Sequence, residues 1–73
     1  MIDIEMYDAL IERKTLLLKE VKYLEEIGDV SKSSHTRISV DSRVYQIKNE
    51  LSFIQPLIDR YELLIDNHYK ALH

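Results

Sequence analysis

Residues 41–72, DSRVYQIKNELSFIQPLIDRYELLIDNHYKAL, decide the fold of this chain. Their apolar side chains recur in alternating steps of three and four residues, which places them along one stripe of an α-helix. We therefore predict one long helix over residues 41–72 with a coiled-coil seam, started by Asp41 or Ser42 as the N-cap. The seam consists of Val44, Ile47, Leu51, Ile54, Ile58, Tyr61, Ile65, His68 and Leu72, of which only His68 is polar.

Pro56 lies in the middle of this predicted helix. A proline lacks the amide that would bond to the carbonyl of Ser52, and its ring clashes with that carbonyl. Because Gln55 is a poor N-cap and the heptad pattern continues past the proline, we expect a continuous helix with a kink near Pro56. The alternative is a break in which Pro56 opens a third helix.

A second amphipathic helix is predicted over residues 3–27, where Leu10, Leu17 and Leu24 recur every seven residues without an intervening Gly or Pro. Gly28 follows at the position expected for a left-handed C-cap. Residues 28–40 are rich in small polar side chains that compete with helix, so we predict a mobile connecting loop there.

The expected fold is all-α, a single domain over residues 1–73 that forms an antiparallel two-helix hairpin. One Gly and one Pro in 73 residues favour helix over a turn-rich β fold. The expected core consists of Leu51, Ile54 and Ile58 against Leu17 and Leu24. A chain this short, without cysteine for a disulfide, is marginally stable by itself, so we also expect a partner.

The charge and hydropathy of the chain argue against several classes of partner. A net charge of −3 gives no electrostatic reason to bind nucleic acid or an anionic membrane. No apolar run approaches the roughly 20 residues that span a bilayer. Asp3, Glu5 and Asp8 stand where a signal peptide would carry basic residues, so we expect a cytoplasmic protein.

The sequence lacks the patterns that usually carry chemistry. There is no Glu-x-x-His pair of the kind that holds metals in helical bundles, and no Gly-rich phosphate loop. We therefore predict no enzyme activity, no metal and no cofactor. The alternative is a small helical mutase, whose only possible parts are Arg13, Arg37, Arg43 and Arg60 with Glu12 or Glu50.

Both predicted helices carry more apolar residues than one hairpin seam can cover. Such surplus apolar surface is typical of protein interfaces. We expect the partner-binding residues to be Tyr7, Ile11 and Leu18 on the first helix and Phe53, Leu57 and Leu64 on the second. The alternative to a foreign protein partner is a homodimeric four-helix bundle that buries these stripes against a second copy of the chain.

Several segments resemble the small co-chaperones of type III secretion needle subunits, the YscE/SsaE type. The resemblance covers most of the chain. It rests on Tyr7-Asp8-Ala9-Leu10-Ile11, on Asp41 followed by Tyr45-Gln46, and on Ile65-Asp66-Asn67-His68-Tyr69. It implies a cytoplasmic complex in which the hairpin and a tetratricopeptide-like co-chaperone together keep the needle subunit from polymerising early. The alternative function is a homodimeric helical regulator or inhibitor of the phage or antitoxin type.

Overall fold

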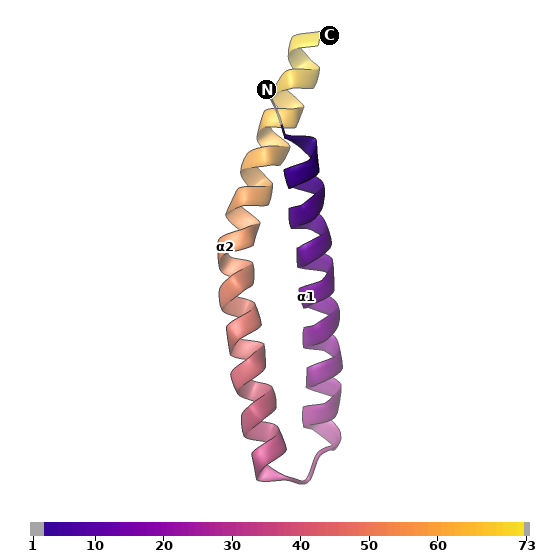
Figure 1. Cartoon of the computed structure of the whole chain (residues 1–73), viewed down its shortest axis with the longest axis vertical. Coiled ribbons are helices and arrows are strands. Elements are labelled where there is room, and N and C mark those ends of the chain that lie inside the picture. The colour runs from indigo at the N-terminus through magenta and orange to yellow at the C-terminus, as the bar shows by residue number, and fades with distance from the viewer. Residues whose placement is uncertain (1–2, 73) are drawn as a thin grey trace.

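Two long helices and a short turn make up the chain, which a computed structural model describes over residues 3–72. Helix α1 spans Ile4–Val30 and helix α2 spans Ser34–Leu72. They run antiparallel and pack along most of their length, so the all-α hairpin predicted from the sequence is confirmed (Figure 1). The molecule is a rod of 57 × 16 × 16 Å. Met1, Ile2 and His73 of the predicted domain lie outside the described residues.

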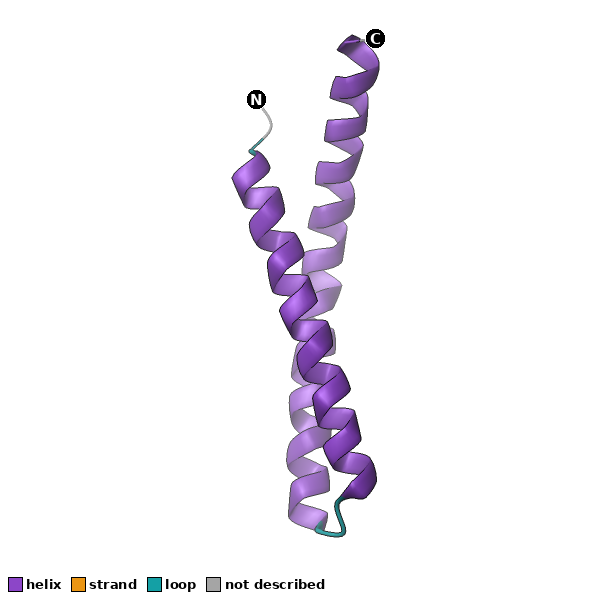
Figure 2. Cartoon of the chain, turned by 90° about the vertical axis from the view of Figure 1, so that its right-hand side faces the viewer, coloured by secondary structure: helices purple, strands orange, loops and turns teal. Residues whose placement is uncertain are grey.

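The predicted loop over 28–40 is wrong, because only Ser31–Ser33 separate the helices (Figure 2). Helix α1 continues through Gly28, which does not adopt the left-handed conformation of a C-cap. Helix α2 starts at Ser34 instead of Asp41, and the Ser33 hydroxyl accepts the amide of Thr36 at 3.4 Å. The earlier start of α2 is explained by Val40, which is only 7% exposed. The stability gained by burying this side chain outweighs the low helix propensity of its polar neighbours.

At its other end α1 begins at Ile4, one residue after the predicted start at residue 3. Asp3 is the N-cap residue, and its carboxylate accepts the amide of Met6 at 3.0 Å. A carboxylate there satisfies an otherwise free helix amide and lies near the positive end of the helix dipole.

The core lies along the predicted seam. Leu17, Ile47, Ile54 and Ile58 form one buried cluster, against which Leu51 and Leu24 pack while partly buried. The predicted pairing of the two leucine and isoleucine series is thus confirmed. Further along α2, Tyr61 and Ile65 are half-buried and His68 is exposed. The side chain of Leu72, the last predicted seam residue, lies outside the described part.

Pro56 does not interrupt α2, which continues unbroken from Ser34 to Leu72. The predicted alternative of a third helix opening at Pro56 is therefore wrong. Figure 1 shows α2 bowed along its length beside α1. The apolar stripe keeps its phase on both sides of the proline, since Ile54 and Ile58 are both buried.

Candidate functional site

The hairpin exposes far more surface than a compact protein of its size. Its accessible surface is 5990 Å², whereas a globular monomer of 8.7 kDa exposes about 4,700 Å². Its radius of gyration is 16.9 Å, against about 11 Å for a compact chain of this length. The excess of about 1,300 Å² exceeds the roughly 800 Å² that each protein contributes to a standard interface.

Large apolar side chains are exposed on both helices, outside the seam that joins them. Isolated apolar side chains are normal on protein surfaces, but grouped ones indicate an interaction site. The described residues of this kind, each about half exposed or more, are Ile4, Met6, Leu16, Leu18, Tyr23, Val30, Ile38, Tyr45, Phe53, Leu57, Leu63, Leu64 and Tyr69.

Two of the six predicted partner-binding residues belong to the packing of the hairpin itself. Tyr7 and Ile11 are half-buried and contact the core cluster. The Tyr7 ring lies 6.3 Å from the Tyr61 ring, and its hydroxyl donates to Glu62 Oε1 at 3.2 Å. Desolvation, followed by the charge of Glu62, raises the pKa of Tyr7 above its ordinary value. These contacts fasten the start of α1 to α2.

The other four predicted residues remain available to a partner. Leu18, Leu57 and Leu64 are each nearly half exposed, and Phe53 is 68% exposed. Phe53, Leu57 and Leu64 share one stripe of α2. The structure therefore separates the predicted residues into an internal pair, one exposed position on α1 and an exposed stripe on α2.

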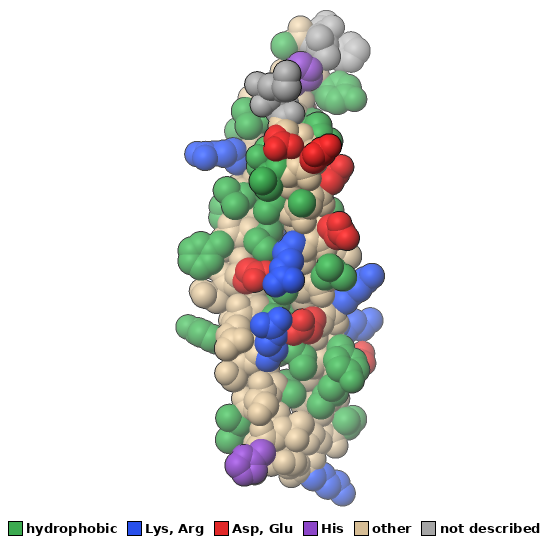
Figure 3. Space-filling view, viewed as in Figure 1, with side chains coloured by type: hydrophobic (Ala, Val, Ile, Leu, Met, Phe, Trp, Pro, Cys, Tyr) green, Lys and Arg blue, Asp and Glu red, His purple; other side chains and the backbone are tan. Residues whose placement is uncertain are grey.

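Two ion pairs cross the surface between the helices and form what we call the ladder: Arg13 with Glu50, and Arg43 with Glu20. The Arg13 guanidinium donates to both oxygens of Glu50, at 2.8 and 3.1 Å. Arg43 donates to both oxygens of Glu20, at 2.5 and 3.2 Å. Figure 3 shows basic and acidic side chains gathered along the junction of the helices, with apolar side chains around them.

The four ladder charges stabilise one another electrostatically. The hydrogen bond from Arg43 lowers the pKa of Glu20, and the hydrogen bond from Arg13 lowers the pKa of Glu50. The same bonds raise the pKa of both arginines. All four side chains stay partly exposed, between 38% and 51%. Exposed pairs contribute little individually to stability, but the two bidentate pairs show which residues of α1 lie level with which residues of α2.

Arg13, Arg43 and Glu50 were considered above only as possible parts of a mutase site, and Glu20 was not singled out. In the structure the charges neutralise one another across the helix junction. A signal was present in the sequence: Arg43 and Glu50 each directly precede a seam residue of α2, and such flanking positions form ion pairs between coiled-coil helices.

Leu18 and the ladder lie on opposite sides of α1. Leu18 is two residues from Glu20, a rotation of about 200° around an α-helix. The hairpin thus has a ladder side and a Leu18 side. Ile4 and Leu18 are exposed on the Leu18 side, seven residues to either side of the half-buried Ile11.

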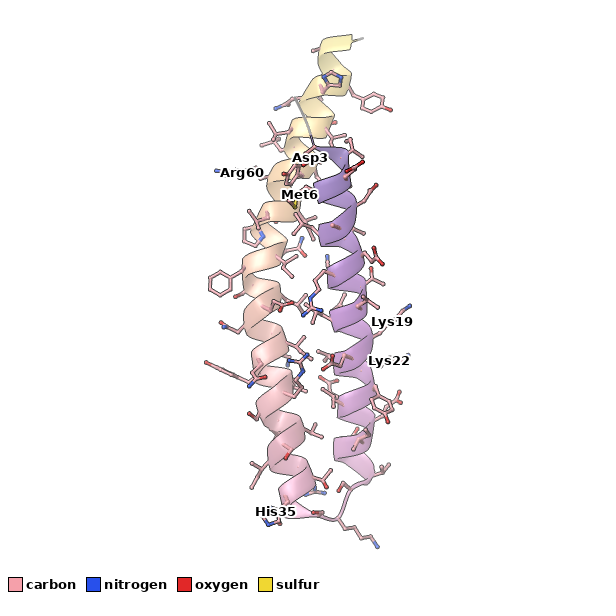
Figure 4. The ribbon with its side chains drawn as sticks, in the orientation of Figure 1. Asp3, Met6, Lys19, Lys22, His35 and Arg60 are labelled. Atoms are coloured by element: carbon pink, nitrogen blue, oxygen red, sulfur yellow. The ribbon has the colours of Figure 1, made fainter. Side chains whose placement is uncertain are left out.

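Histidine and acidic side chains do not form a metal site in the part of the chain that the structure describes. No group of three or more His, Asp or Glu side chains there could hold a metal ion. His35 lies at the turn end of the hairpin (Figure 4), while the exposed His68 lies near the opposite end of α2. A hollow of about 380 Å³ beside His35 is lined by Leu24, Ile27 and Val40 together with Thr36 and Ser39, and no acidic residue lines it.

Neither described helix is long and apolar enough to cross a membrane. In comparisons with known proteins, the chain matches no protein family, no curated protein and no solved structure.

Proposed function

We propose that this chain is a protein-binding subunit, a co-chaperone or adaptor that contributes a helical surface to a heteromeric complex. The observation that carries this proposal is the unburied surface: about 1,300 Å² more than a compact monomer, with large apolar side chains on several sides. Grouped apolar side chains on a protein surface mark sites of interaction with other molecules.

The Leu18 side is the surface that we assign to a foreign partner. Ile4 and Leu18 are exposed two heptads apart on one side of α1, a spacing at which both could contact a helix laid alongside. A groove between helices of a repeat protein accommodates such a row of anchors. The ladder side remains free in this arrangement.

The resemblance to the YscE/SsaE type of co-chaperone supplies a specific form of the proposal. In that form the hairpin and a tetratricopeptide-like co-chaperone bind a type III secretion needle subunit in the cytoplasm and keep it from polymerising. The chain needs no cofactor or metal for this role, because its contribution is a surface. A homodimeric regulator or inhibitor is the alternative, since a second copy could cover the same excess surface.

A capture experiment with matched variants tests the proposal. The chain is co-expressed with a type III needle subunit and the tetratricopeptide-like protein encoded beside it, and the complex is purified through a tag on the hairpin. Leu18→Asp should abolish capture because it places a charge in an apolar contact. The melting temperature of the isolated hairpin should change little, since Leu18 is nearly half exposed.

Leu63→Asp is the control, because Leu63 is 60% exposed and lies on the other helix. It should leave capture intact. Capture by Leu18→Asp at the wild-type level would contradict the assigned surface, and absence of capture by the wild-type chain would contradict the co-chaperone role.

A further inference from the structure

A second stripe of α2 lies outside the hairpin seam and follows the same alternating spacing. We call it the outer stripe: Glu50, Phe53, Leu57, Arg60 and Leu64, in steps of three and four residues. Phe53 is 68% exposed, and Leu57 and Leu64 are 46% exposed each. A stripe with this period is a second coiled-coil seam with no helix of this chain against it.

Arg60 is the one charge of the outer stripe that the hairpin leaves unused. It points away from α1 (Figure 4) and forms no ion pair among the described residues. Glu50 is bound to Arg13, but a carboxylate has about four acceptor sites and can serve a second guanidinium. The stripe therefore holds an unpaired cation and, ten residues before it, a carboxylate with capacity to spare.

We propose that the outer stripe binds the outer stripe of a second copy of this chain, antiparallel, about a two-fold axis level with Gln55. In this register Phe53 packs on Leu57 of the second copy, and Leu57 packs on Phe53 of the second copy. Arg60 meets Glu50 of the second copy on one side of the axis, and the symmetric pair forms on the other. Four apolar side chains occupy the centre, with an ion pair at each end.

This arrangement has the anatomy of a stable interface, an apolar centre with a polar rim. It is also self-complementary, as a two-fold interface must be, because each residue and its counterpart come from the same stripe. Met6 adds to the apolar centre. It lies one heptad before Arg13, and Leu57 lies one heptad after Glu50, so the pairing of Arg13 with Glu50 places Met6 level with Leu57. Met6 points from α1 toward α2 in Figure 4.

The surface area is sufficient for such a dimer. Two separate hairpins expose about 4,100 Å² more than a globular protein of twice 8.7 kDa, which exposes about 7,900 Å², so a dimer contact need use only part of this excess. Homodimer interfaces commonly bury about 2,000–5,000 Å². The Leu18 side faces away from the outer stripe, so this inference does not depend on the proposed heteromeric function.

The mass of the purified chain in solution tests the proposal. Sedimentation equilibrium over a range of concentrations should give a reversible dimer of twice 8.7 kDa. Leu57→Asp should yield a monomer with an unchanged helical signal, whereas Leu63→Asp should remain dimeric. Arg60→Glu should weaken the dimer at least about tenfold, because it sets two carboxylates against each other. A monomeric wild-type chain, or a dimer that survives Leu57→Asp, would overturn the proposal.

Cross-linking tests the register, because the chain has no natural cysteine. A chain carrying Arg60→Cys should form a disulfide with a chain carrying Glu50→Cys. Neither variant should cross-link to itself, since the two copies of position 60 lie about 15 Å apart along the helices in this register. Self-cross-linking in place of the mixed product would overturn the antiparallel arrangement. Capture of the partner by Leu57→Asp would show that the Leu18 side functions independently.

Discussion

Gly28 of α1 lies against Val40 of α2, so closely that a β-carbon on Gly28 would stand 3.4 Å from Val40 Cγ1. That distance is at the short edge of ordinary van der Waals contact. Gly28 has no left-handed backbone conformation, so an alanine there needs no change of φ. We expect Gly28→Ala to stabilise the hairpin by about 0.5–1 kcal/mol, because glycine is a poor helix residue.

Urea unfolding followed by circular dichroism measures this effect. A lower free energy of unfolding for Gly28→Ala would mean that the contact with Val40 is too tight to accept a methyl group and that the glycine is required for close packing of the helices.

The hairpin could be predicted from the sequence because the apolar residues of the α2 seam follow the three-and-four spacing of a helix stripe throughout. Ile47, Ile54 and Ile58 belong to this stripe, and all three are buried. The bounds of the turn could not be predicted. Gly28 is typical of a helix end, and the serines after it are typical of a loop. These local conformational preferences are outweighed by the free energy gained when Val40 is buried.

Which apolar residues the hairpin leaves exposed was only partly predictable for a related reason. Hydrophobic spacing identifies which residues are in excess but not how far around a helix its partner reaches. Tyr7 and Ile11 lie within reach of α2, whereas Leu18 lies outside it. The ladder was not predicted because the pairing of Arg13 with Glu50 depends on the register of the two helices. That register depends on the length of the turn, which is shorter than the predicted loop.

Pro56→Ala should stabilise the hairpin by about 1–3 kcal/mol. Proline inside a helix removes one hydrogen bond and clashes with the preceding turn, and Pro56 is exposed, so alanine would fit without repacking. Chemical unfolding of the two proteins gives the comparison. Lower stability of the variant would instead show that both halves of α2 reach α1 only because the proline bends the helix.

Ile54→Ala should destabilise the hairpin by about 2–4 kcal/mol, since Ile54 is 8% exposed within the core cluster. In a domain this small that is enough to unfold much of the population. Thermal melts should show the loss. Leu63→Ala is the control, with an expected change within about 0.5 kcal/mol. Equal melting temperatures for wild type and Ile54→Ala would contradict the antiparallel seam.

His68→Gln should leave both the melting temperature and partner capture nearly unchanged. His68 occupies a seam position by sequence but is exposed, so its polar ring stays hydrated in the folded chain. Melts and the capture experiment test both expectations. Loss of capture with a normal melt would assign His68 a direct role in binding.

Glu50→Gln should destabilise the hairpin near neutral pH, and the difference from wild type should shrink in acid. Arg13 lowers the pKa of Glu50 in the folded state below the ordinary value of 4.5. A lowered folded pKa means that the unfolded chain takes up a proton first as the pH falls. The contribution of the pair is therefore complete above about pH 5 and is lost as the pH falls through the folded pKa.

Urea unfolding at about pH 7 and about pH 3 measures the difference between Glu50→Gln and wild type. Glu26→Gln, which changes an exposed carboxylate outside the ladder, is the control and should change the free energy of unfolding by no more than about 0.5 kcal/mol. A Glu50→Gln difference that stays constant across this range would show that the pair fixes geometry without contributing to the acid dependence of folding.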